Sequence, residues 1–509
     1  MKSIYSLLLG IGVSGLLLAG CDKDNKNDGF VVGSDQEQTG GNDNQDNGVA
    51  SSARNELYRP QVHFTPKKNW INDPNGMVYV DGIYHLYYQY NPQGNGWGNM
   101  SWGHATSTDL MHWDEKPVAM VRNQWGDIFS GSAIVDKENV AGFGKNAILA
   151  FYTASGEHQQ QCLAYSTDGG LTFTQYENNP VIANTSLPDF RDPKVIWHEE
   201  SGKWIMCLAL GWSTQIEFWG SADLKHWEIL STFTTDAARC NIGQWECPDL
   251  IRMPYNGGEK WVLIVSNNPG GPVGGSGTEY FVGDFDGKEF KAMNLDYPLW
   301  LDYGADNYAG VTWSNAPAGR TLFIGWMNNW NYSGDVPCSP WRSAMTLPRE
   351  LTLKDVNGSP LLCAPIVKEL DGIAGAWRAA VAGEMEKAAA YEAKFAVSLD
   401  SNTSIRLANS FGEYMDIEVR PSADMLTVKR GSSTGKTDFH SLFSIPGIQA
   451  PLHKDGGEMI LHLVLDASSV EIFSEDGRVS VTNLVFPQEP YNRILGVEGV
   501  EYRPLSSIW

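Results

Sequence analysis

One carboxylate early in the chain has an indole and amides for neighbours. In segment 70–76 (WINDPNG), Asp73 follows Trp70 and Asn72, and Gln89 comes a short distance later. An apolar platform with fixed hydrogen-bonding groups around it is what a sugar-binding site needs. The Asp-Pro-Asn-Gly run is equally typical of a tight β-turn at a strand start, so these residues alone leave both interpretations open.

Two opposite charges stand side by side in segment 190–194, where Arg191 precedes Asp192 and Pro193. An ordinary surface ion pair of this kind contributes little to stability. Adjacent side chains on a strand point to opposite faces, so a direct contact between Arg191 and Asp192 requires a bulge or a turn. Pro193 favours an extended backbone at the residue before it.

A third carboxylate, Glu246, lies between Trp245 and Cys247 and is followed by Pro248. Apolar surroundings disfavour the charged form and raise the pKa of a carboxyl group. A raised pKa suits a general acid that works near neutral pH. The alternative is a glutamate at a strand end that only caps or pairs.

Together the three motifs indicate glycoside hydrolysis, which uses two carboxylates and here a third as helper. A cysteine nucleophile is disfavoured because no cysteine stands beside a histidine. The glycine-rich segment 270–275 lacks the Lys-Ser/Thr pair and the helix of a phosphate-binding loop. The cysteines after Cys21 form no Cys-x-x-Cys pair, so we expect no metal and no cofactor.

The acids must be brought together by the fold, because they are far apart in sequence. Residues 75–330 alternate β-rich runs with Gly, Asn, Asp and Pro turns, without a helical period. An Asp followed by an aromatic recurs about every 60 residues, and a fifth strong strand covers 322–326. The four pairs are Asp109–Trp113, Asp168–Phe173, Asp223–Trp227 and Asp286–Phe290.

This repeat predicts an all-β fold that begins with a five-bladed β-propeller over residues 53–360. The Asp–aromatic pairs are then structural turns, with the aromatic packed between blades. The innermost strands meet at a central axis, where distant acids can share one funnel. From about residue 375 tryptophans almost vanish and new strand patterns appear, so 361–509 is predicted to be a linker and a C-terminal β-sandwich.

The N-terminus has the features of an export signal. Segment 1–20 has a lysine and a short apolar run, as in a signal peptide. Its end resembles the lipobox of bacterial lipoproteins, in which the cysteine, here Cys21, is lipidated; an ordinary signal peptide with an incidental cysteine is the alternative. Segment 21–52 is acidic and polar, typical of a flexible tether. We therefore expect an exported lipoprotein of the outer membrane, facing the cell surface or the periplasm.

The composition restricts the partners. Hydrophobic residues make up 42 % of the chain and aromatic ones 11 %, which is ample for a core. The net charge of −23 disfavours nucleic-acid binding. Contact with a membrane is expected only through the lipid anchor, and the oligomeric state is left open.

The motifs taken together resemble glycoside hydrolase family 32, the invertases, inulinases and levanases. The resemblance covers roughly residues 58–509. It rests on segments 70–76, 129–133, 191–193, 246–249, 303–306, 325–330, 341–343, 469–473 and 483–487. It implies a five-bladed propeller followed by a β-sandwich, in agreement with the repeat. It also implies a retaining double displacement at C2 of a fructofuranosyl unit.

Carried over, the resemblance makes Asp73 the nucleophile, Glu246 the general acid/base and Asp192 the transition-state stabiliser. The carboxyl groups of Asp73 and Glu246 should then lie about 5–5.5 Å apart. It places Asp306 as a further ligand of sugar hydroxyls and Trp330, or its neighbour Trp326, as a pocket wall. The other expected sugar-binding residues are Trp70, Asn72, Gln89, Trp97, Phe129, Ser130 and Arg191.

Four functions compete. The first is a fructan hydrolase acting on levan (β-2,6) or inulin (β-2,1), which the lipid anchor and tether favour. The second is an invertase that hydrolyses sucrose with the same machinery. A surface glycan-binding protein without activity is disfavoured because all three acids are present. A sialidase-like propeller enzyme is disfavoured because no trio of arginine motifs is evident. The sequence does not choose between the two linkages, or between endo and exo cutting.

Overall fold

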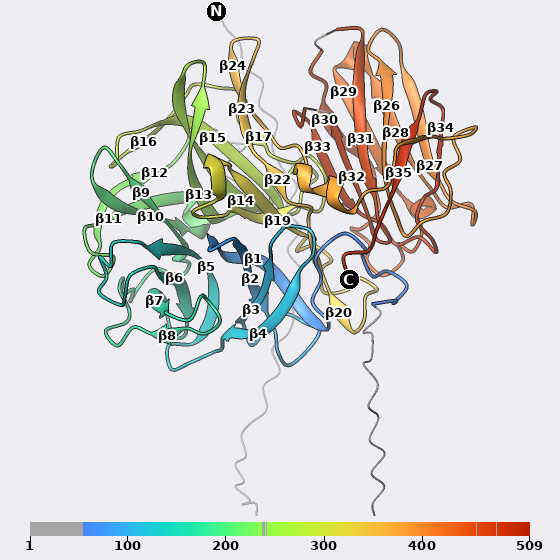
Figure 1. Cartoon of the computed structure of the whole chain (residues 1–509). Helices are drawn as coiled ribbons and strands as arrows, with labels where there is room; N and C mark the ends of the chain where they lie inside the picture. The colour runs from blue at the N-terminus through green and yellow to red at the C-terminus, as the bar shows by residue number, and fades with distance from the viewer. Residues whose placement is uncertain (1–53, 237–239, 241, 455, 475) are drawn as a thin grey trace, which may run out of the picture. The chain divides into compact units, whose positions relative to one another are not determined.

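The computed structural model describes residues 54–236, 240, 242–454, 456–474 and 476–509. Strands connected by loops dominate this part of the chain, with a few short 3₁₀ helices (Figure 1). No helix in these ranges is both long and apolar enough to cross a membrane. The expected signal peptide, the tether and Cys21 lie outside the described residues.

The five predicted blades are present as antiparallel sheets, four of them built from consecutive strands (Figure 1). Blade one contains β1 (Asn69–Val80), β2 (Ile83–Tyr90), β3 (Ser101–Ser107) and β4 (Asp114–Met120). Blade two contains β5 (Asp127–Asp136), β6 (Ala147–Ser155), β7 (Gln159–Ser166) and β8 (Thr174–Gln175). Blade three contains β9 (Arg191–His198), β10 (Lys203–Leu210), β11 (Gln215–Ser221) and β12 (Glu228–Phe233), with η1 (Gly211–Ser213) between β10 and β11.

Blade four contains β13 (Gln244–Tyr255), β14 (Gly258–Asn268), β15 (Gly277–Phe285) and β16 (Phe290–Ala292), and β17 (Leu299–Trp300) pairs with β15. Blade five contains β18 (Tyr308–Thr312), β19 (Leu322–Met327), β21 (Ala344–Met345) and β22 (Arg349–Glu350), with η2 (Pro317–Gly319) after β18. The first strand of each blade, namely β1, β5, β9, β13 and β18, is the innermost one.

The four Asp–aromatic pairs are structural, as predicted. Each aspartate lies between the third and fourth strands of its blade and accepts backbone N–H groups from residues just after it. The aromatic then packs against the preceding blade, with ring centroids 5.2–5.8 Å apart. These contacts are Phe173 on Tyr87, Trp227 on Phe151 and Phe290 on Phe233. A local turn motif therefore also joins neighbouring blades.

The ring is closed by two contacts between its ends. Trp113 of blade one stacks on Trp313, which directly follows β18 of blade five, with ring centroids 6.3 Å apart. In addition, β20 (Trp341–Arg342) pairs in parallel with the start of β1. The chain thus joins its last propeller strands to its first, which leaves the innermost strands facing one axis.

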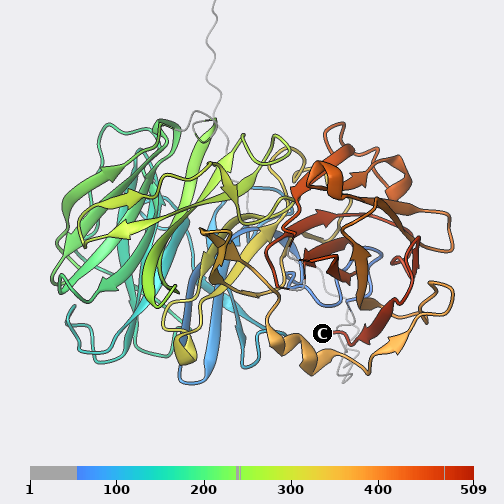
Figure 2. The same ribbon diagram turned by 90° about the horizontal axis from the view of Figure 1, so that it is seen from above.

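A hairpin of β23 (Thr352–Val356) and β24 (Ser359–Cys363) and then η3 (Lys368–Ile373) lead from the propeller to the predicted sandwich. One sheet of the sandwich contains β25 (Arg378–Ala379), β26 (Ala390–Ser398), β31 (Glu458–Leu465), β32 (Ser469–Ser474), β33 (Ser480–Leu484) and β35 (Glu501–Leu505). The other contains β27 (Thr403–Ala408), β28 (Tyr414–Arg420), β29 (Met425–Arg430), β30 (Ile445–Pro451) and β34 (Arg493–Leu495), with η4 (Pro421–Ala423) and η5 (Ser432–Thr434) nearby. Figure 2 shows these strands in orange and red.

Buried ion pairs connect propeller segments to the sandwich. Arg430 on β29 contacts Asp306 at 2.5 Å, and both side chains are fully buried. Arg349 on β22 contacts Asp302 at 2.9 Å and lies 3.7 Å from Glu471 on β32. Residues 53–509 form one compact unit, and the domain boundaries at 360/361 stay a prediction.

Candidate active site

All three acids lie on innermost strands at places where the strand pairing shifts register. The shift falls between Ile71 and Pro74 on β1, between Glu246 and Asp249 on β13, and on β10 opposite the start of β9. A bulge of this kind re-aims side chains locally. Asp192 has a φ of 65° and Cys247 a φ of 48°, in the left-handed region that non-glycine residues rarely occupy. The irregularity that a direct contact between Arg191 and Asp192 requires is therefore present. The extended backbone expected at Asp192 is wrong, because the fold holds this residue in the left-handed region.

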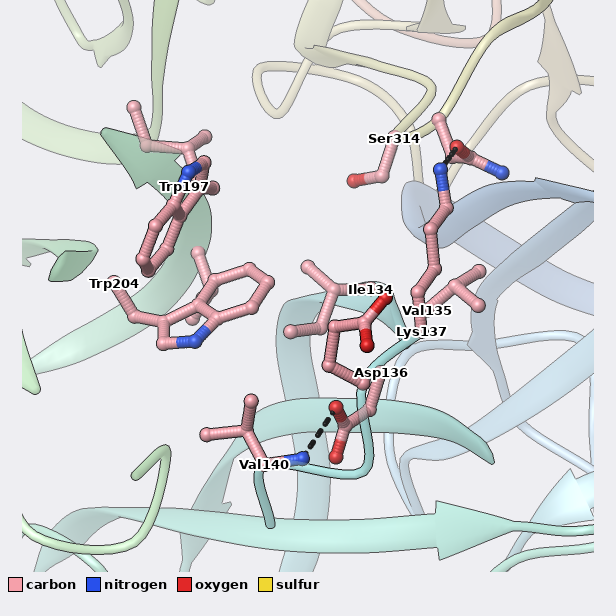
Figure 3. A pocket seen from close by; sticks show the side chains of 12 residues that line it. Ile134, Val135, Asp136, Lys137, Val140, Trp197, Trp204 and Ser314 are labelled. Atoms are coloured by element: carbon pink, nitrogen blue, oxygen red, sulfur yellow. Dashed lines mark hydrogen bonds between the residues drawn. The ribbon is translucent and has the colours of Figure 1, made fainter. Parts of the chain in front are cut away.

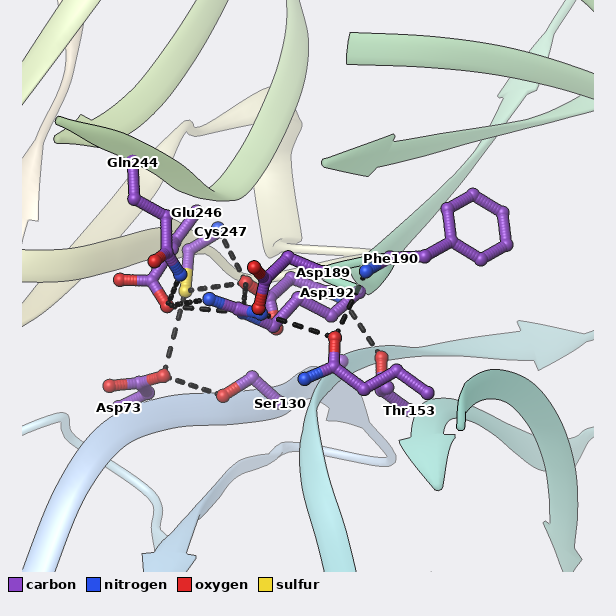
Figure 4. A network of polar contacts seen from close by, with 12 residues as sticks. Asp73, Ser130, Thr153, Asp189, Phe190, Asp192, Gln244, Glu246 and Cys247 are labelled. Carbon is purple, nitrogen blue, oxygen red and sulfur yellow. Dashed lines mark hydrogen bonds and ion pairs between the residues drawn. The ribbon is translucent and has the colours of Figure 1, made fainter. Parts of the chain in front are cut away.

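Asp73 is held by two side-chain donors. The Ser130 hydroxyl donates to Oδ2 at 2.6 Å (Figure 4), and Asn72 Nδ2 donates to Oδ1 at 3.0 Å. Burial, together with the charge of Glu246, raises the pKa of Asp73, while Ser130 and Asn72 act in the opposite direction. The carboxylate is oriented by fixed donors, and its charge is costly to keep without a cation nearby.

Asp192 lies deeper in the same cluster. Its Oδ2 accepts the backbone N–H of Cys247 at 2.9 Å, and Arg191 Nε is 3.9 Å away. Burial raises the pKa of Asp192 to about 7 with the help of Glu246 and Asp73, although Arg191 lowers it. A cation bound beside Asp192 would favour its charged form.

Glu246 is surrounded by donors, so the expectation of an apolar setting for it is wrong. Its Oε1 accepts hydrogen bonds from Arg191 Nη2 at 2.9 Å and from Gln244 Nε2 at 3.1 Å. The Tyr308 hydroxyl donates to Oε2. Glu246 does pair with its neighbours, as the alternative of a structural glutamate expects. Its side chain is nevertheless 20 % exposed and can be reached by a ligand.

The thiol of Cys247 joins two of the acids. Its sulfur lies 3.6 Å from Asp73 Oδ2 and 3.7 Å from Asp192 Oδ2 (Figure 4). Burial, reinforced by the three carboxylates, keeps the pKa of this thiol well above its usual range, so it stays neutral. The structure therefore gathers Asp73, Asp192 and Glu246 at one place. The expected carboxyl separation of about 5–5.5 Å stays a prediction.

The aromatic residues predicted for the pocket form a wall beside Asp73. Trp70 donates from its indole N–H to Asn72 Oδ1 at 2.8 Å and stacks on Trp330, with ring centroids 6.0 Å apart. Trp330 is half-buried, whereas Trp326 and Trp70 are both fully buried. Of these three, Trp330 is the one that can touch a ligand, and Trp70 holds Asn72 from behind.

The remaining predicted pocket residues lie in two further groups. Trp97 is 54 % exposed and contacts Phe129 edge to face at 6.1 Å. Gln89 is buried and donates to the carbonyl of Ile128 at 2.9 Å, just before Phe129 and Ser130. Its position suits support of that segment.

Asp306 does not lie where the resemblance suggested. It is fully buried, its Oδ1 accepts the Tyr332 hydroxyl at 2.5 Å, and its Oδ2 binds Arg430 and the Leu484 N–H. Oδ1 is thus used within the propeller and Oδ2 in a contact with the sandwich. The expectation that Asp306 binds sugar hydroxyls is wrong, because these contacts occupy both of its oxygens and bury the side chain.

Sequence reasoning missed the residues that hold the acids. Arg191 also binds Asp189 at 2.5 Å and Gln159 at 3.1 Å, and neither partner stood out in the sequence. Tyr308 lies only two positions after Asp306, inside a segment already noted, but no pattern singled it out. The contacts of Arg191 with Gln159 and of Tyr308 with Glu246 join different blades, so no local spacing predicts them. Asp189 lies only two positions before Arg191.

Two family models together match most of the chain. The glycosyl hydrolases family 32 N-terminal domain matches residues 63–365, and the family 32 C-terminal domain matches residues 374–500. A levanase of Bacillus subtilis is 43 % identical, with 90 % of this chain and 72 % of the levanase covered. An extracellular exo-inulinase of Aspergillus niger is 37 % identical, with 89 % of this chain and 95 % of the relative covered.

Solved structures agree in the fold. The exo-inulinase of Aspergillus awamori superimposes with a TM-score of 0.81 at 35 % identity, over 89 % of this chain and 99 % of its own. A fructofuranosidase of Schwanniomyces occidentalis complexed with fructosylnystose gives a TM-score of 0.79 at 33 % identity, over 89 % of this chain and 98 % of its own. The family resemblance and the predicted propeller with its following sandwich are confirmed, and the chain belongs to family 32 of the glycosyl hydrolases, as a β-fructofuranosidase-type glycoside hydrolase.

Proposed function

We propose that this chain hydrolyses β-fructofuranosidic bonds of fructans by a retaining double displacement. The observation that carries the proposal is the meeting of Asp73, Asp192 and Glu246 from three blades around one thiol and one guanidinium. The similarity to a levanase and to exo-inulinases supports a fructan as the substrate. The roles below rest on the contacts of each side chain.

In the first step Asp73 attacks C2 of the fructosyl unit, and the bond from C2 to the leaving oxygen breaks. Glu246 gives its proton to that oxygen, so the leaving sugar departs as an alcohol. Asn72 and Ser130 hold the Asp73 carboxylate in place during the attack. The product of this step is a fructosyl ester on Asp73.

In the second step a water molecule attacks C2 from the side that the leaving group occupied. Glu246, now ionised, takes a proton from the water, and the ester bond to Asp73 breaks. Arg191 and Gln244 keep the Glu246 carboxylate oriented through both proton transfers. Free fructose leaves with its anomeric configuration retained.

Asp192 stabilises the positive charge that develops on the sugar ring in both steps. The buried carboxylate has few donors, so a nearby cation interacts with it strongly. Arg191 keeps Asp192 partly charged before the reaction, because it lowers a pKa that burial raises. The neutral Cys247 thiol adds no competing negative charge between Asp73 and Asp192.

We expect Ser130→Ala to move the acidic limb of the kcat/KM profile to higher pH. The hydrogen bond from Ser130 lowers the pKa of Asp73, so its loss raises that pKa further and leaves less ionised nucleophile at low pH. A hydrogen bond to a charged group contributes about 1.5–3 kcal/mol, which corresponds to about 1–2 pH units. The measurement is kcat/KM against pH, with Ser130→Thr as the matched control that keeps a hydroxyl. An unmoved limb in Ser130→Ala would contradict the role of this hydroxyl.

The test of the substrate is a product time course of the purified enzyme on levan, inulin and sucrose. Because several relatives are named exo-inulinases, we expect action at chain ends, with fructose as the only early product. The faster polymer identifies the linkage. An early ladder of oligosaccharides would contradict chain-end action, and activity on sucrose alone would favour the invertase function. No release from any of the three would reject the proposal.

The proposal also includes export and a lipid anchor at Cys21. It is supported by the lipobox-like end of segment 1–20 and by relatives that are named extracellular. We place the enzyme on the outer membrane, with the acidic segment 21–52 as tether. In a Gram-negative host, Cys21→Ser should move the protein from the membrane fraction to the soluble fraction, as seen by immunoblot. Equal membrane retention of Cys21→Ser would reject lipidation at this residue.

A further inference from the structure

A second cavity lies near the far end of β9, the strand whose start carries Asp192. Its volume is about 510 Å³, and residues of β5, β9, β10 and the segment after β18 line it (Figure 3). Along β9 the chain runs from Asp192 at the active site to Trp197 at this cavity. At roughly 3.3 Å per residue, about 16 Å of strand separates Asp192 from Trp197. The cavity is therefore distinct from the active site.

One wall of this cavity is aromatic. Trp197 and Trp204 lie side by side in Figure 3, with ring centroids 5.2 Å apart and planes at 62°. Trp197 is 45 % exposed, and its indole N–H donates to Glu199 at 2.6 Å, which fixes the ring. Ile134 and Val140 extend the apolar surface. A tryptophan with an apolar ring face and a fixed N–H is a residue type enriched at binding interfaces.

The other wall is polar. The Lys137 ammonium donates to Asn315 Oδ1 at 2.7 Å, and the Asn315 amide donates to the carbonyl of Tyr79 at 2.7 Å. Ser314 adds a hydroxyl to this wall (Figure 3). Asp136 also lines the cavity, but its oxygens accept the N–H groups of Val140 and Ala141 and so shape the turn. The donors of Lys137 that Asn315 does not use can reach a ligand.

We propose that this cavity is a second carbohydrate site that binds a fructosyl unit of the polymer whose hydrolysis is proposed above. An aromatic face on one side and an ammonium, an amide and a hydroxyl on the other match a sugar ring, which has an apolar face and a rim of hydroxyl groups. The volume lies within the range of about 300–1,000 Å³ typical of small-molecule sites. A long fructan presents many identical units, so a second contact raises the effective concentration of chain near the enzyme.

The test is affinity electrophoresis in gels that contain levan or inulin. A Glu246→Gln background prevents digestion of the polymer. In this background, we expect Trp197→Ala to weaken polymer binding about five- to tenfold, the scale of one lost aromatic contact. Trp197→Phe keeps an aromatic face and should stay close to the parent. Phe411→Ala, which removes a 56 % exposed aromatic from the sandwich, is the matched control and should change nothing.

A second measurement separates binding at this cavity from damage to the active site. With Glu246 intact, Trp197→Ala should hydrolyse the short substrate fructosylnystose with kcat/KM within about twofold of the parent, because a short chain cannot reach both sites. Unchanged retention of Trp197→Ala in both gels would overturn the inference, and equal retention of the parent in a dextran gel would overturn its fructan specificity. If the parent neither hydrolyses nor binds a fructan, the proposed function is rejected. If the parent does both and Trp197→Ala retains the parent's polymer binding, only this inference is rejected.

Discussion

Replacement of Glu246 by alanine is expected to lower kcat on fructan by about 10³-fold while substrate binding remains. The leaving oxygen of a sugar needs a proton as the C2–O bond breaks, and Glu246 is the carboxyl group that Arg191, Gln244 and Tyr308 hold in position. The measurement pairs kcat on the faster polymer with calorimetric binding of fructosylnystose to the variant.

A matched variant makes this test specific. Glu246→Gln keeps the size of the side chain and should lose turnover to the same extent, because an amide cannot transfer the proton. Its binding should stay near the parent, since an amide of the same size fills the same place and leaves the half-buried Trp330 unchanged. Substantial residual activity of Glu246→Ala on fructan would reject the general acid/base role.

Asp73→Asn is expected to abolish turnover and to prevent formation of the fructosyl-enzyme. The amide oxygen can still accept from Asn72, and the Ser130 hydroxyl can turn to accept from the new amide N–H, so the local structure should persist. It cannot form the ester, because an amide is a far weaker nucleophile than a carboxylate. Rapid acid quenching followed by intact-protein mass spectrometry detects the covalent adduct.

The control for this experiment is Asp192→Asn. That change removes charge stabilisation but leaves the nucleophile, so the adduct should still form, only more slowly. The presence or absence of the adduct therefore distinguishes the roles of Asp73 and Asp192, which a rate alone would not do. Detection of a normal fructosyl-enzyme in Asp73→Asn would contradict the assignment of the nucleophile.

The sequence by itself determined the architecture of the propeller, because that architecture repeats a local motif. An aspartate that accepts the next backbone N–H groups is turn chemistry that spans a few residues. The aromatic that follows it packs on the preceding blade, as Phe173 does on Tyr87. Four copies and a fifth strong strand were therefore enough to predict five blades. The three acids could also be named, because each stands in a short segment of unusual composition.

Only the tertiary structure decided what surrounds those acids. Glu246 was expected among apolar groups, yet donors from blades three, four and five meet it, including Tyr308. Asp306 was expected at the sugar, yet Arg430 of the sandwich binds it in the interior. Closure of the ring and packing of the sandwich bring together residues that are more than 50 positions apart. Such contacts depend on the summed geometry of many strands, and no local pattern of residues encodes them.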